Sequence, residues 1–230
     1  MSQHASMETY QNNTAASFID DGKYQDAIAS LSNSIRDFSG YEEWVTSSCC
    51  ESCDGAKVLS LDQCMLCNQD TFKEDGTPYL YKTPIRIPTE SNVICGKKKH
   101  HDIISAIMVF NLALSHHLQA LESVTPRDCE FYLQKATILY ELAFEIQKKE
   151  HFDSNYVFEL AIINNLAMIH QRQNNKTLAN QGFRHMLSIL MYLVDSGRNV
   201  QCGRLEGFHY NVSLSASSTR ISTENVAGAA

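Results

Sequence analysis

Residues 111–116 read NLALSH, and two other stretches repeat this pattern: residues 13–18 read NTAASF and residues 165–170 read NLAMIH. The shared pattern is Asn, any residue, Ala, two further residues, and then an aromatic residue or His. Each copy is followed by a second amphipathic stretch with a small residue and, four positions later, a bulky one. These pairs are Ala27 and Leu31, Ala136 and Tyr140, and Ala179 and Phe183. Since a small residue lets two helices approach and a bulky one fills the adjoining space, each copy predicts a pair of packed helices.

The hydrophobic pattern around the hexads is helical. In residues 7–38 and 102–195, apolar side chains recur at i, i+3, i+4 and i+7, the spacing of amphipathic helices. Gly22 falls where a first helix should end, and Thr125 followed by Pro126 is typical of a helix N-terminus. The sequence therefore predicts an all-α fold with six main helices.

The repeated pattern resembles the tetratricopeptide repeat, a helix-turn-helix unit of about 34 residues. The first copy matches through Ala15, Phe18, Gly22 and Tyr24, and the third has Asn174 where the turn glycine would be. The resemblance implies one helical domain over residues 1–200, with units at 5–40, 102–150 and 154–196 and an irregular, Cys-rich insertion at 41–100. Phrases such as FNLALSHHLQAL and LSILMYLVDSG also resemble a group of helical-repeat proteins of marine diatoms, which implies no activity.

Two segments outside the repeats lack the helical hydrophobic pattern. Residues 79–87 alternate along the chain, but the prolines at 84 and 88 permit only an edge strand or an extended connector. Residues 201–230 are predicted to be a disordered tail, because the chain from Ser213 onward is small and polar.

The resemblance also implies a binding surface. In tetratricopeptide proteins the first helix of each unit lines a concave, peptide-binding groove, and the asparagine two places before the small alanine points into it. Matched to this chain, the implied peptide-binding residues are Asn13, Asn111, Leu114, His117, Asn164, Asn165, Met168 and Gln171, with Asn12 nearby. A carboxamide suits this role because it donates and accepts at once, and so can hold a peptide main chain. The alternative is that these asparagines bond locally or face water.

The insertion contains the most specific metal-binding motif in the sequence. Cys50, Cys53, Cys64 and Cys67 form two CxxC pairs, which could close a four-cysteine zinc site. The spacer between the pairs is shorter than in the usual zinc ribbon, however, and no pattern of basic or aromatic strands surrounds it. A flexible Cys-rich insertion is the favoured interpretation, and a structural zinc protein acting in regulation is the alternative.

Composition excludes several classes of function. The formal net charge of −7 argues against nucleic acid as a ligand, and no apolar run is long enough to span a membrane. The N-terminus shows no signal peptide, so the expected location is the cytoplasm, or the nucleus if the basic run at residues 97–101 acts as a signal.

No catalytic motif appears, and His116 and His170 occupy core positions of the repeat. We therefore expect a non-catalytic scaffold that binds a protein or peptide and needs no cofactor, with an enzyme as the least favoured alternative. Its oligomeric state and partner are left open.

Overall fold

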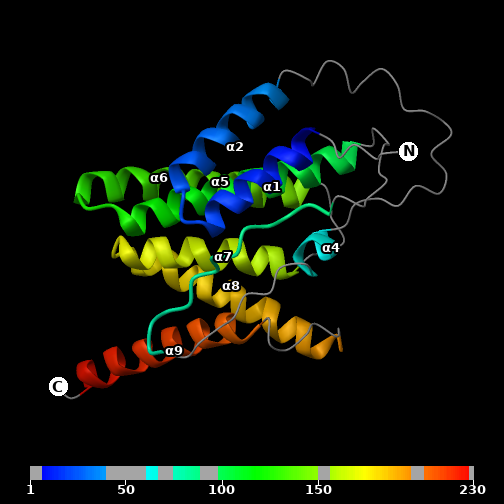
Figure 1. The fold of residues 1–230 in the computed structure, drawn as a ribbon. Coiled ribbons are helices and arrows are strands. Elements are labelled where there is room, and N and C mark those ends of the chain that lie inside the picture. Colours follow the sequence, from blue (N-terminus) through cyan, green and yellow to red (C-terminus); the bar gives the residue numbers. More distant parts are fainter. Residues whose placement is uncertain are drawn as a thin grey trace. The chain divides into compact units, whose positions relative to one another are not determined.

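The computed structural model describes residues 7–39, 61–66, 75–88, 98–149, 156–197 and 205–227. These ranges contain eight helices and no β-strand (Figure 1). The helices are α1 (Met7–Asp20), α2 (Tyr24–Ser39), α4 (Leu61–Leu66), α5 (Lys98–Glu122), α6 (Pro126–Lys149), α7 (Tyr156–Arg172), α8 (Lys176–Asp195) and α9 (Glu206–Ala227). The all-α fold is confirmed, and the six predicted main helices correspond to α1, α2 and α5 to α8; the count of six is too low, because α9 is a further long helix.

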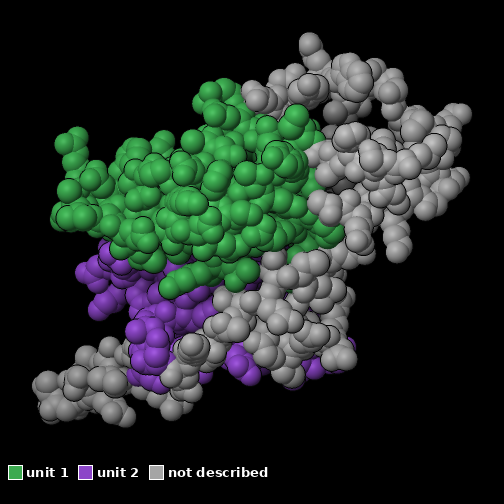
Figure 2. Space-filling model, viewed as in Figure 1, with its two compact units in different colours: residues 1–68, 82–155 green, residues 69–81, 156–230 purple. Residues whose placement is uncertain are grey.

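The chain divides into two compact units, coloured separately in Figure 2. Unit 1 comprises residues 1–68 and 82–155, with helices α1, α2, α4, α5 and α6. Unit 2 comprises residues 69–81 and 156–230, with helices α7, α8 and α9. In both units, helices that follow one another in sequence pack as antiparallel pairs.

Helix α5 is the centre of unit 1, since it packs against α1, α2 and α6. The insertion therefore does not separate the first helix pair from the second. Asp102–Glu122 of α5 is long and apolar enough to cross a membrane, with a mean hydropathy of 1.3, but 89% of its apolar window is buried inside the protein. This burial is typical of a core helix.

The small residues of the hexads lie where helices meet. Ala15, Ala113 and Ala167 are all buried, with at most 1% of their surface exposed. In unit 2, a Cβ atom built on Gly182 of α8 would lie only 2.9 Å from Cβ of Ala167 on α7. The close approach of α7 and α8 thus depends on two small residues facing each other.

The turns inside the first and third helix pairs share one hydrogen-bond pattern. Gly22 has a φ of 74°, and the N–H of Lys23 donates to the carbonyl of Phe18 at 2.8 Å. Asn174 has a φ of 60°, and the N–H of Asn175 donates to the carbonyl of His170, also at 2.8 Å. Asn replaces the turn glycine because it tolerates the left-handed conformation better than most residues.

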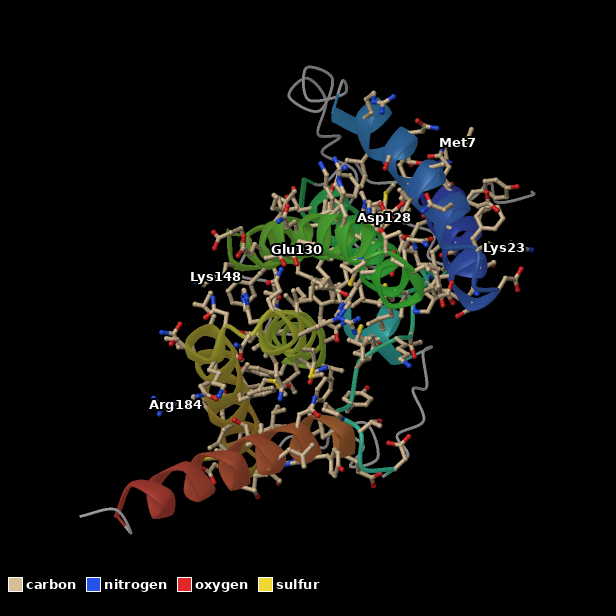
Figure 3. The ribbon with its side chains drawn as sticks, turned by 90° about the vertical axis from the view of Figure 1, so that its left-hand side faces the viewer. Met7, Lys23, Asp128, Glu130, Lys148 and Arg184 are labelled. Atoms are coloured by element: carbon tan, nitrogen blue, oxygen red, sulfur yellow. The ribbon has the colours of Figure 1, made fainter. Side chains whose placement is uncertain are left out.

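The prediction for the C-terminal region is wrong for residues 206–227, which form helix α9. Leu205, Phe208 and Asn211 are buried, so the first turns of α9 belong to the core of unit 2. Packing of this apolar face outweighs the low helix propensity of the serines that follow. Figure 3 shows the charged side chains of Lys23, in the turn between α1 and α2, and of Arg184 on α8 pointing outward.

The contact between Gly182 and Ala167 generates a stability prediction. Gly182→Leu should lower the free energy of unfolding by about 1 to 3 kcal/mol, because the added atoms overpack the α7–α8 contact. Urea denaturation measures the loss. Gln181→Leu adds a similar side chain at the neighbouring exposed position and should leave stability nearly unchanged. Equal stability of the two variants would contradict the packing.

Candidate functional site

Each unit contains a cluster of three asparagines, and all of them except Asn211 lie on helices that carry the repeated pattern. The cluster of unit 1 consists of Asn12 and Asn13 on α1 and Asn111 on α5. The cluster of unit 2 consists of Asn164 and Asn165 on α7 and Asn211 on α9. Five of the six are at least 98% buried, and Asn13 is half-buried. Buried carboxamides need hydrogen-bond partners, and here the partners are main-chain groups of residues 79–88.

Residues 79–88, which we call the extended segment, form neither helix nor strand. The segment belongs to unit 2 as far as Tyr81 and to unit 1 from Lys82 onward. Pro84 and Pro88 restrict the residues before them to extended conformations, which explains why the backbone does not coil here.

In unit 1, two asparagines each hold one isoleucine of the segment by both main-chain groups. Asn111 accepts the N–H of Ile85 at 2.8 Å and donates to the carbonyl of the same residue at 2.8 Å. Asn13 accepts the N–H of Ile87 at 2.8 Å and donates to its carbonyl at 2.7 Å. Both asparagines therefore form hydrogen bonds with the main chain of the segment, as one strand of a β-sheet does with its neighbour.

Asn12 completes the unit 1 cluster. Its amide group donates to the carbonyl of Ile85 at 3.0 Å and to Oδ1 of Asn13 at 3.3 Å. Its own Oδ1 accepts from the amide of Asn111 at 2.9 Å. These bonds fix which end of each carboxamide donates, so the cluster is preorganised for an extended backbone.

The cluster of unit 2 repeats this geometry. Asn165 accepts the N–H of Tyr81 at 3.1 Å and donates to its carbonyl at 2.9 Å. Asn211 accepts the N–H of Tyr79 at 2.7 Å and donates to its carbonyl at 2.6 Å. Asn164 occupies the same place as Asn12 does in unit 1, because it donates to the carbonyl of Tyr79 at 3.1 Å and accepts from Asn211 at 2.6 Å.

The four residues held in this way are 79, 81, 85 and 87, all odd-numbered. In an extended chain the N–H and C=O of one residue point to the same side, and those of the next residue point to the opposite side. The asparagines of each unit therefore hold a single edge of the segment.

The side chains of three of the held residues, Tyr81, Ile85 and Ile87, are also buried, and that of Tyr79 is half-buried. Ile85 and Ile87 of unit 1 are 0% and 2% exposed. In unit 2, the ring of Tyr81 stacks on Phe208 and the ring of Tyr79 meets Phe208 edge-on, with centroids 6.3 and 5.4 Å apart. Gly207 makes room for this contact, since a Cβ there would lie 2.5 Å from the Tyr79 ring.

The other predicted binding residues lie in different surroundings. Leu114 and His117 are buried in unit 1, and the ring of His117 meets that of Tyr140 edge-on. Met168 is half-buried, and its sulfur lies 3.7 Å from the amide nitrogen of Asn211. Gln171 is exposed in the last turn of α7.

The sequence did not identify Asn211, Phe208 or the extended segment as parts of the site. A signal for Asn211 was present, because residues 211–215 read NVSLS and nearly repeat NLALS of residues 111–115. The substitution of Ser for Ala and the polar chain that follows concealed it. No local sequence pattern could indicate that these asparagines hold a segment of the same chain.

His116 of α5 is a buried histidine, 9% exposed, whose ring lies 5.8 Å from that of Tyr132. Burial, together with the positive charge of Lys135, lowers the pKa of His116 to about 4. The imidazole is therefore neutral at pH 7, in keeping with its predicted packing role.

The zinc hypothesis stays a prediction, because Cys50, Cys53 and Cys67 lie outside the described residues. Cys64 is buried in α4. Within the described ranges, no group of three or more His, Cys, Asp and Glu side chains is arranged to hold a metal ion.

Comparison with known proteins assigns no relationship: no family model, curated protein or solved structure matches this chain.

The unit 1 cluster predicts the effect of losing one carboxamide. Asn111→Ala should leave the N–H of Ile85 without a partner, and each unsatisfied buried group typically costs about 1 to 3 kcal/mol. Hydrogen exchange at the Ile85 amide should accelerate, and the midpoint of urea denaturation should fall. Asn33→Ala, at an exposed site on α2, is the matched control. Unchanged protection at Ile85 would contradict the bidentate contact.

The lowered pKa of His116 predicts a dependence of stability on acid. From pH 6.5 down to about 4, the unfolded chain binds a proton at this histidine and the folded chain does not, so the free energy of unfolding falls with pH. A His116→Gln variant should lose less stability than the parent between pH 7 and pH 4.5, as measured by urea denaturation. An NMR titration with a His116 midpoint near 6.5 would contradict the prediction.

Proposed function

We propose that this protein is a non-catalytic binding module that holds an extended peptide by its main chain, and that the extended segment is a built-in occupant of the peptide site. The observation that carries the proposal is the set of four bidentate asparagines, at positions 13, 111, 165 and 211, each of which holds the N–H and C=O of a single residue.

We further propose that the helices bearing these asparagines are the first helices of tetratricopeptide-like units. Two features support this. The hexad recurs at one register on α1, α5 and α7, and the turns at Gly22 and Asn174 have equivalent hydrogen bonds. Helix α9, with Asn211 and Ser213, would begin a fourth unit.

The chemistry of the contact favours a binding role. A carboxamide that holds main-chain groups makes no demand on the side chain of the residue it holds, so the same site accepts many sequences. A covalently attached occupant also has a high effective concentration, in the millimolar range for short flexible connections. An external peptide must therefore compete with the segment, and the segment sets a threshold for binding.

The test uses the full chain with residues 79–88 replaced by a Gly-Ser linker of the same length. A fluorescent peptide of residues 78–88 (PYLYKTPIRIP) should bind this segment-replaced chain saturably, as measured by anisotropy. The intact chain should bind the peptide at least about tenfold more weakly, because its site is open for only a fraction of the time.

Two controls make this result decisive. Asn13→Ala combined with Asn111→Ala should weaken peptide binding to the segment-replaced chain, whereas Asn33→Ala should not. If the segment-replaced chain unfolds, added peptide should restore its thermal transition. A folded segment-replaced chain that ignores the peptide, or an unfolded one that the peptide does not rescue, would refute the proposal.

A further inference from the structure

One side chain of the extended segment is recognised individually. The guanidinium of Arg86 forms an ion pair with the carboxylate of Asp20 and donates to Oγ of Ser17 at 3.1 Å and to the main-chain carbonyl of Asn13 at 3.2 Å. All three partners belong to α1, in unit 1. Asn13 thus contacts two consecutive residues of the segment, since its side chain holds Ile87 and its carbonyl accepts from Arg86.

The three partners are placed by the helix itself. Asn13, Ser17 and Asp20 stand at i, i+4 and i+7, so their side chains share one face of α1. Asp20 is the last residue of the helix, where the helix dipole favours a cation nearby. A guanidinium presents several N–H groups in a fixed fork, which suits three acceptors arranged along a single face.

The neighbours of Arg86 define the rest of the recognised sequence. Ile85 and Ile87 are buried, and Pro84 and Pro88 stand outside them. Proline restricts the preceding residue to extended backbone, so both Thr83 and Ile87 are biased toward the bound conformation before binding. Preorganisation of this kind lowers the entropy lost when a peptide is ordered.

In unit 2, the corresponding face of α7 offers no equivalent site for arginine among the described residues. Alignment of the hexads places Ile169 and Arg172 of α7 where α1 has Ser17 and Asp20. An apolar side chain and a second cation cannot accept hydrogen bonds from a guanidinium. Selection of an arginine is therefore a property of unit 1.

We infer that unit 1 selects an extended segment in which an arginine stands between two β-branched aliphatic residues bounded by prolines, and that its partner is a protein presenting such a segment. This inference rests on the proposed function and specifies its ligand. The sequence PIRIP of residues 84–88 occupies the site as an internal copy of that ligand.

The expected magnitude of the selectivity for arginine follows from the solvent exposure of the Arg86–Asp20 ion pair. The side chains of Asp20 and Arg86 are 48% and 38% exposed, so water screens their attraction. An exposed ion pair contributes little free energy of binding by itself. The hydrogen bonds of Arg86 to Ser17 and Asn13 add to the contribution of the pair with Asp20. We expect the arginine to raise affinity about threefold to tenfold over a neutral residue, while most of the affinity comes from the main chain and the isoleucines.

The experiment compares peptides on the segment-replaced chain. Relative to the peptide PYLYKTPIRIP, the peptide with Arg86→Glu should bind about tenfold more weakly, and the peptide with Arg86→Lys about threefold more weakly because it keeps the charge but loses the fork. An Asp20→Lys chain should prefer the Arg86→Glu peptide over the parent. Asp21→Lys, at the next position, which is also exposed, is the matched control and should not alter the preference.

The outcomes separate this inference from the proposed function. Equal affinity for all three peptides would overturn the arginine selectivity while leaving main-chain binding intact. Absence of binding by every peptide, including the parent, would refute the proposed function itself.

A measurement on the intact chain covers the case in which the segment-replaced chain does not fold. Arg86→Glu should accelerate hydrogen exchange at the amides of Ile85 and Ile87, and a second substitution, Asp20→Lys, should restore the protection. If the double variant is no better protected than Arg86→Glu alone, the pairing of Arg86 with Asp20 does not select the segment, and the inference fails.

Discussion

An extended backbone without a neighbouring strand must obtain hydrogen bonds from side chains, and the asparagines of this protein meet that requirement. The flank of an α-helix offers no free N–H or C=O, because these groups bond along the helix. A buried residue such as Ile85 therefore needs a side chain that accepts its N–H and donates to its carbonyl. The planar carboxamide of Asn or Gln does both with an acceptor oxygen and a donor nitrogen on the same carbon, and the shorter Asn holds its amide closer to the helix. The recurrence of Asn at one register follows from this constraint.

The same constraint explains why each cluster contains a third asparagine. Asn111 and Asn13 each use the carbonyl oxygen and one amide hydrogen for the segment, and a carboxamide has a second amide hydrogen and a second acceptor position left over. Asn12 takes up this capacity in unit 1, as Asn164 does in unit 2. A network satisfied in this way fixes the donor and acceptor positions, whereas a partly satisfied network would cost stability. The Asn-Asn pairs at 12–13 and 164–165 are thus a structural requirement of the two asparagine clusters.

The sequence was sufficient for six of the long helices, but not for α9, and only partly sufficient for the site. Apolar periodicity located α1, α2 and α5 to α8, because burial of a continuous stripe determines these helices. It failed at α9, where a few buried residues around Phe208 stabilise a helix whose later residues are small and polar. The extended character of residues 79–87 followed from the prolines. Its pairing with Asn111 did not, because that contact depends on tertiary packing, which leaves no local periodicity in the sequence.

Under the proposed function, the division between main-chain and side-chain contacts determines what a partner must provide. Bidentate asparagines hold any extended backbone, so they supply affinity without discrimination. Discrimination in this proposal then depends on side chains of the segment, such as Arg86 against Asp20 in unit 1 and Tyr81 against Phe208 in unit 2. A peptide that offers only a backbone competes poorly with an attached segment of high effective concentration. In this proposal, a peptide that also matches the side chains gains the additional free energy that displacement requires, so the attached segment would make a sequence-tolerant peptide site selective.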